Sequence, residues 1–272
     1  MKHRLLFLLA CIVFILLCTN CCKLLYTYYS PAKEHLIYQT TQHNDSILRI
    51  AYIGDSWADG HQHQSHNCII AKLLSNRLSR PAKVSSFGIS GLMSKEIYNA
   101  LFKLDSYKHF MEDGYDYCFI SAGINDCNEK MSLTYYKESM NCIIRFLLAN
   151  NIHPIILEIP NYNILNEYEK QTKICKITRS FSMIINGTPL DCKQQYRDVL
   201  NKLIQEQDYQ DKVSIIRYKS WNNNYQKGLK ELYISDQLHL NEQGYHVLDS
   251  AIAEEIIRLN TLSKKIISPP KI

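Results

Sequence analysis

Short apolar runs alternate with longer stretches of helical length through most of the chain. Five runs rich in Ile, Val and aromatic residues predict strands. They cover residues 48–53, 82–87, 117–121, 152–159 and 212–217. The helix-length patterns cover 67–79, 93–104, 133–150, 190–207 and 242–262. This alternation favours an α/β fold with a five-stranded parallel sheet covered by helices on both faces, because parallel neighbours need a crossover connection.

The beginning of the chain has a different pattern. Lys2 and Arg4 precede an apolar run that begins at Leu5, and the 18 residues from Leu5 through Cys22 carry no charge. Basic residues before an apolar run are typical of export signals, and roughly 17–25 residues are needed for a membrane-spanning helix. Because no convincing small-x-small cleavage site follows, we expect an uncleaved signal-anchor. The alternatives are a cleaved signal, a lipid anchor and the buried helix of a soluble protein.

Four segments follow from these patterns. We expect a signal-anchor over 1–23, a stalk without sustained periodicity over 24–47, a globular domain over 48–262 and a flexible tail over 263–272. Positive charge before the span predicts an N-terminus in the cytoplasm and a domain outside it, periplasmic or extracellular. Within the domain, residues 161–189 interrupt the alternation and are expected to form a surface excursion near the carboxyl ends of the strands.

The charge balance argues against nucleic acid as a partner. Of the 31 basic residues, three lie in the first 23 positions, which contain no acidic residue. The remaining 28 nearly balance the 26 acidic residues, so the domain carries no basic footprint. The glycine patterns that bind nucleotide phosphates are absent, and we expect no cofactor. His61, His63 and His66 have irregular spacing and no suitable Cys partner, which disfavours a metal site.

The ten cysteines are unevenly placed along the chain. Four lie in the first 22 residues, and the other six have mostly apolar neighbours, so most are expected to be buried. Cys175 and Cys192 flank one loop-rich stretch. They are the pair that we consider for a disulfide in an oxidising compartment.

Polar or flexible residues follow the predicted strands at the points where each strand ends. Ser56 comes after the first strand, Gly91 after the second and Asn125 after the third, while Asp236 and His239 precede the last helix. Because the carboxyl ends of parallel strands meet at one edge of a sheet, we expect these residues to gather there.

Together these residues are the parts of a serine hydrolase. Ser56 is the expected nucleophile, His239 the base that takes its proton, and Asp236 the carboxylate that orients the imidazole. The backbone N–H groups of Ser56 and Gly91 and the Asn125 amide would stabilise an oxyanion. The Asp-to-His spacing of three residues allows one turn to present both side chains.

The four blocks that carry these residues, in this order, resemble the SGNH hydrolase family, also called the GDSL esterase/lipase family. The blocks are Gly54-Asp55-Ser56, Gly91, Gly123-Ile124-Asn125-Asp126 and Asp236 to His239, and the resemblance spans about 48–260. It implies a flavodoxin-like three-layer α/β/α sandwich that hydrolyses or transfers acyl groups without a metal. Trp57 replaces the smaller residue of many members, and we expect it to narrow the site.

We therefore expect a membrane-anchored, extracytoplasmic serine ester hydrolase that removes acyl groups, with acetyl as the first candidate, from a glycan or other ester. An O-acyltransferase would use the same site to acylate a polysaccharide, with a membrane acyl-donor partner. A lipase or lysophospholipase is a further alternative, because a tethered site lies near lipid. A non-catalytic binding module that retains the fold is the alternative from another class.

Overall fold

Five parallel strands form one sheet in the order β2-β1-β3-β4-β5. They are β1 (Leu48–Gly54), β2 (Ala82–Gly88), β3 (Tyr117–Ser121), β4 (His153–Leu157) and β5 (Ser214–Ile216). All five predicted strands are therefore confirmed, with β4 and β5 shorter than expected. The strands β1, β3 and β4 are buried almost throughout, and their side chains are mostly apolar, whereas the edge strand β2 is only partly buried. The strand order reverses between β1 and β3, where ligands bind in sheets of this type.

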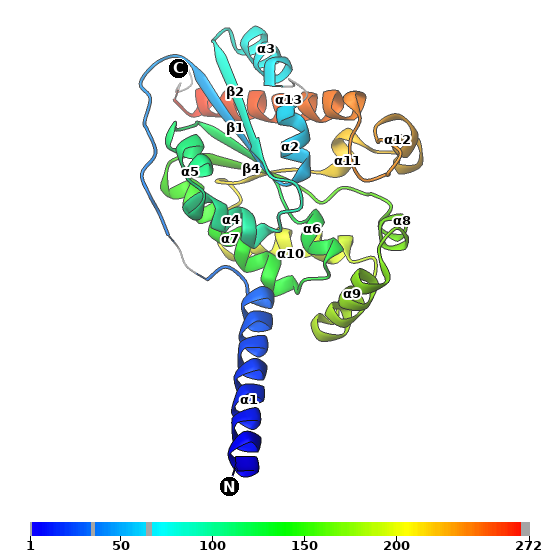
Figure 1. Cartoon of the computed structure of the whole chain (residues 1–272). Helices are drawn as coiled ribbons and strands as arrows, with labels where there is room; N and C mark the ends of the chain where they lie inside the picture. The colour runs from blue at the N-terminus through cyan, green and yellow to red at the C-terminus, as the bar shows by residue number, and fades with distance from the viewer. Residues whose placement is uncertain (1, 34–35, 64–66, 268–272) are drawn as a thin grey trace. The chain divides into compact units, whose positions relative to one another are not determined.

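Helices cover both faces of the sheet and complete the three layers predicted (Figure 1). One face carries α2 (Ser56–His63), α3 (Asn67–Leu78) and α13 (Glu242–Ile267). The other carries α4 (Ser94–Lys103), α5 (Asp105–Glu112), α7 (Leu133–Ala149) and α10 (Lys193–Glu206). The five predicted helices are present, with α13 extending beyond its predicted end. Five further helices join these elements: α6 (Ile124–Asn128), α8 (Ile164–Glu169), α9 (Lys173–Asn186), α11 (Tyr218–Trp221) and α12 (Tyr225–Glu231).

This computed structural model describes residues 2–33, 36–63 and 67–267. The chain divides into two compact units, Met1–Pro31 and Ala32–Ile272. The first unit consists mainly of α1 (Lys2–Tyr29). Among the described residues, α1 is the one helix long and apolar enough to cross a membrane, over the 18 residues Ile12–Tyr29. A cleaved signal sequence at this end of a chain meets the same criterion.

The segment that precedes β1 is held by the domain through its backbone. The N–H of Ala32 donates to Ser139 Oγ at 3.2 Å, and that of Thr40 donates to Asn150 Oδ1 at 2.9 Å. The segment expected as a stalk over 24–47 thus has two parts in the structure. Its beginning continues α1, whereas residues from Ala32 onward belong to the second unit. At the other end, α13 includes the first residues of the expected tail, and 268–272 lie outside the described residues.

Glycine is required at position 54 because β1 and β3 approach each other closely there. Its φ is +148°, and a Cβ at this position would lie 2.0 Å from the carbonyl oxygen of Ser121. We expect Gly54→Ala to lower the free energy of unfolding by at least about 3 kcal/mol, because backbone strain of about 1–3 kcal/mol adds to a steric clash. Urea unfolding measures this loss.

Gly187 provides the matched control for this substitution. It also has a positive φ, of +63°, but a Cβ there would meet nothing within 4 Å. Gly187→Ala should therefore cost only the left-handed backbone strain, about 1–2 kcal/mol. Equal losses for the two variants would show that the contact with Ser121 does not constrain position 54.

Candidate active site

The three side chains predicted to be catalytic lie in one hydrogen-bonded row. Ser56 is the first residue of α2, and its Oγ lies 2.9 Å from His239 Nε2. His239 Nδ1 lies 2.6 Å from Asp236 Oδ2. The side chains of His239 and Asp236 are 34% and 29% exposed, so the row is open to solvent.

A tight turn presents Asp236 and His239 side by side. Asp236 Oδ1 accepts hydrogen bonds from the backbone N–H groups of Leu238 and His239, at 2.8 and 2.9 Å. Partial burial alone would raise the pKa of Asp236, but hydrogen bonds from the His239 ring and these N–H groups outweigh it and lower the pKa. An ionised Asp236 accepts a hydrogen bond from the Nδ1–H group of His239, which leaves Nε2 as the acceptor for the Ser56 hydroxyl.

The loops that carry Gly91 and Asn125 adjoin this row at the same edge of the sheet. Ile89, just after β2, donates its N–H to the Gly54 carbonyl at 3.1 Å. Asn125 lies on α6, directly after β3, and its amide donates to the Leu92 carbonyl at 3.0 Å. That bond joins Asn125 to the loop of Gly91, whose φ is +85° and at which a Cβ would meet nothing within 4 Å. The first N–H groups of α2 are unsatisfied within the helix and carry its positive end.

Two buried carboxyl groups, for which the sequence predicted no separate role, hold these loops. Asp55 Oδ1 accepts from the N–H of Trp57 and from Ser121 Oγ, both at 3.1 Å. Asp126 accepts from the N–H and the hydroxyl of Ser94, at the start of α4. Burial raises the pKa of Asp55 to about 7 and that of Asp126 to about 6.

Trp57 does not narrow the site as expected. Its side chain is fully buried, and its ring packs against the rings of Trp221 and Tyr233, with centroids 6.0 and 6.4 Å apart. The large residue after the serine therefore fills the core beneath α2.

The buried side chain of His61 links α2 to two other elements by hydrogen bonds. Its Nδ1 lies 2.8 Å from Ser86 Oγ and its Nε2 lies 2.9 Å from Asp249 Oδ1, and all three residues are buried. Both ring nitrogens are thus engaged, and they join α2 to β2 and to α13. The side chain of His63 and the whole of His66 lie outside the described residues.

Cys192 lies beside Cys127, and not beside Cys175, the disulfide partner considered from the sequence. Its sulfur is 3.1 Å from the sulfur of Cys127 on α6, and both side chains are buried. Cys175 is exposed on α9. The structure therefore offers Cys127, rather than Cys175, as the partner of Cys192.

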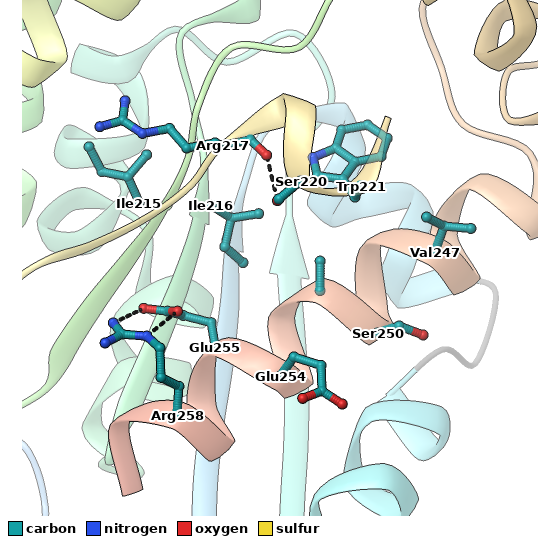
Figure 2. A pocket seen from close by; sticks show the side chains of 11 residues that line it. Ile215, Ile216, Arg217, Ser220, Trp221, Val247, Ser250, Glu254, Glu255 and Arg258 are labelled. Carbon is teal, nitrogen blue, oxygen red and sulfur yellow. Dashed lines mark hydrogen bonds and ion pairs between the residues drawn. The ribbon is translucent and has the colours of Figure 1, made fainter. Parts of the chain in front are cut away.

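A hollow of about 720 Å³ lies apart from the row, between β5, α11 and α13. Figure 2 shows Ser220, Trp221, Val247 and Ser250 around it, with the ion pair of Glu255 and Arg258 at one end. Neither Ser56 nor His239 lines it.

The sequence matches the GDSL-like Lipase/Acylhydrolase family over residues 52–247, a range that includes all the residues predicted for the site. The chain belongs to this family. It is thereby a carboxylic ester hydrolase of the SGNH/GDSL type, as the sequence predicted. No match was found among curated proteins.

Solved structures show the same fold at low sequence identity. A lipase/acylhydrolase from Enterococcus faecalis is 17% identical with a TM-score of 0.55, over 77% of this chain and 95% of that one. An acetylxylan esterase from Geobacillus stearothermophilus is 18% identical with a TM-score of 0.53, over 77% and 94%. A GDSL-like lipase from Bacteroides thetaiotaomicron is 16% identical with a TM-score of 0.50, over 77% and 87%.

The raised pKa of Asp55 predicts a pH dependence of stability. Folding raises this pKa to about 7, whereas an unfolded Asp titrates at about 4. Between these values only the folded carboxyl keeps its proton, so stability falls as pH rises, by up to about 1.4 kcal/mol per pH unit. Asp55→Asn keeps the Oδ1 acceptor but does not titrate. We expect the variant to lose less stability than the parent between pH 5 and 7 in urea unfolding.

Asp211→Asn, at an exposed position, serves as the control and should retain the parent's pH dependence. An Asp55→Asn variant that loses as much stability as the parent over this range would contradict the assignment.

The cysteine pair predicts a disulfide that excludes Cys175. A bond of about 2 Å requires only a small approach of the sulfur atoms of Cys127 and Cys192. With oxidised glutathione, the two thiols should give up two protons and two electrons to form this bond and release two molecules of reduced glutathione. Peptide mass spectrometry without reductant should detect the Cys127–Cys192 peptide pair and an alkylated Cys175. A Cys175–Cys192 linkage would contradict the prediction, and Cys192→Ser should abolish the linked peptide.

Proposed function

We propose that this protein is a membrane-anchored, extracytoplasmic ester hydrolase that removes acyl groups, with acetyl as the first candidate, from a glycan through an acyl-enzyme on Ser56. The observation that carries the proposal is the hydrogen-bonded row of Ser56, His239 and Asp236. Each member stands at the distance that its role requires, in the order nucleophile, base and orienting carboxylate.

In the first step, Ser56 Oγ attacks the ester carbonyl carbon while His239 Nε2 takes the hydroxyl proton. Asp236, ionised because its pKa is lowered, stabilises the resulting imidazolium through Nδ1. His239 then returns the proton to the departing alcohol, which leaves an ester on Ser56. A water molecule attacks this ester by the same steps in reverse, with His239 again as the base, and releases the carboxylic acid.

The negative charge on the former carbonyl oxygen needs hydrogen-bond donors at each step. We assign this role to the N–H groups of Ser56 and Gly91 and to the amide of Asn125. The position of Ser56 at the first turn of α2 adds the positive end of the helix. One donor of this kind contributes about 3–4 kcal/mol to stabilisation of the transition state.

Hydrolysis, rather than transfer of the acyl group to a second alcohol, is favoured by the exposure of the row. With His239 and Asp236 about one-third exposed, water reaches the acyl-enzyme directly. An acyltransferase has to limit this access, because water would otherwise compete with the acceptor.

A glycan substrate outside the cytoplasm is supported by two observations. Lys2 and Arg4 lie at the beginning of α1, before its apolar run, an arrangement that keeps an N-terminus in the cytoplasm and places the following domain outside. Among the structures with the same fold is an acetylxylan esterase. An outward-facing site of this kind would meet acylated envelope or extracellular polysaccharides.

The proposal predicts that Ser56→Ala lowers kcat for p-nitrophenyl acetate by at least about 100-fold, because nucleophile removal in serine hydrolases costs several orders of magnitude. His239→Ala should have a similar effect. Initial rates on the full chain in detergent measure both, and thermal unfolding establishes that each variant is folded.

Ser250→Ala is the matched serine control. Ser250 lines the separate hollow in Figure 2 and donates to the carbonyl of His246 in its own helix. This variant should retain the parent's rate. Full activity in a folded Ser56→Ala variant would refute the nucleophile assignment.

A further inference from the structure

Helix α9, in the excursion over 161–189, exposes most of its large apolar side chains. They lie along one side of the helix: Ile174, Ile177, Phe181, Ile184 and Ile185. Their exposed fractions range from 50% for Phe181 to 80% for Ile184. Large contiguous apolar patches on a soluble domain mark interaction surfaces. We call these five residues the α9 stripe.

The helix is attached to the domain by its polar side. Arg179 forms an ion pair with Glu129, just after α6, and Asn186 donates its amide to the Lys130 carbonyl at 2.8 Å. Ser182, on the same side, is buried. An amphipathic helix at the surface of a soluble domain normally packs its apolar side on the core. In α9 the orientation is the opposite, and a structure outside the domain has to cover the stripe.

The charges of α9 favour a lipid surface as that cover. The helix contains Lys173, Lys176 and Arg179 and no acidic residue, and of these Arg179 is paired with Glu129 and Lys176 with Glu169. Lys173 is exposed at the beginning of the stripe. Basic amphipathic helices with an outward apolar side lie in the headgroup region of bilayers that contain anionic lipids, where apolar burial and charge attraction act together.

The place where the chain enters the domain brings α9 within reach of such a surface. Ala32 bonds to Ser139 on α7, and α9 bonds to Glu129 and Lys130, just before α7 begins. Ser139 is six residues into α7, which corresponds to about 9 Å along the helix. Two residues separate the end of α1 from Ala32, a link of at most about 11 Å. A membrane that holds α1 is therefore close to the part of the domain that holds α9.

We propose that the α9 stripe inserts into the headgroup region of an anionic membrane. The closeness of α9 to the membrane rests on the proposed anchoring by α1, whereas the exposure of the stripe and the charges of α9 do not depend on that anchoring. The insertion would also restrain the candidate active site, because α8 is joined to the turn that carries Asp236. Asn166 on α8 donates to the Asp236 carbonyl at 2.9 Å, and Asn163 donates to Gln237 Oε1 at 2.7 Å. The docked protein holds its site at the membrane surface.

The test places a tryptophan in the stripe. Phe181→Trp is made in the full chain, which is reconstituted into vesicles of equal parts phosphatidylglycerol and phosphatidylcholine. The acyl chains are either brominated or plain, since bromine quenches tryptophan emission on contact. The native Trp57 and Trp221 are buried, and the parent protein measures their share. We expect brominated lipid to remove the emission added by Phe181→Trp, and to remove less in vesicles of phosphatidylcholine alone.

Lys202→Trp supplies the matched control, because Lys202 is exposed on α10 and should give no added quenching. Ile177→Trp repeats the measurement at a second position of the stripe, in case position 181 does not tolerate the larger ring. Absence of added quenching at both positions in folded protein overturns the proposal. If the same protein is then dimeric by light scattering, a second copy covers the stripe.

Extraction of the vesicles with alkaline carbonate tests α1 separately. Protein that stays in the pellet is anchored by α1 whether or not the stripe is quenched. Quenching in protein that carbonate removes would support insertion of α9 and refute anchoring. The two proposals therefore fail independently.

Discussion

The site depends on the close approach of two strand ends. The carbonyl of Ser121, at the end of β3, lies where the Cβ of residue 54 would be, so only glycine fits there. The same carbonyl accepts the N–H of Asp55 at 3.1 Å, and the Ser121 hydroxyl donates to the Asp55 carboxyl. These contacts fix the direction in which the chain leaves β1, and Ser56 follows as the first residue of α2. The position of the candidate nucleophile is therefore set by backbone packing.

Asp55 and Asp126 lower the stability of the folded protein when ionised, but they also fix the geometry of the loops around the candidate active site. Burial raises the pKa of Asp55 and Asp126, which means that their ionised forms are disfavoured in the folded protein. In return, Asp55 joins the turn before α2 to β3, and Asp126 joins α6 to the start of α4. Candidate catalytic groups need such rigid support to stay in their working geometry.

The sheet, its main helices and the candidate row were accessible from sequence because each has a local signal. Strands buried on both faces are apolar runs, and polar residues at their ends indicate the edge where a site forms. Other features have no such signal. The polar sequence of α2, with Gly60 within it, conceals a helix. The pairing of Cys192 with Cys127 joins residues far apart in the chain. Periodicity identifies an amphipathic helix, but it does not state whether the apolar side faces the core, and α9 faces outward.

The outward side of α9 and the turn of Asp236 are parts of one connected structure. Helix α8 lies between them, bonded to the turn through Asn166 and to α9 through the contact of Tyr168 with Ser180. A membrane that fixes α9 would therefore also restrict the turn that presents His239 to Ser56. Acyl groups at the surface would meet a site already held in its working geometry. Protein detached from the membrane would present the same residues with this outer support absent.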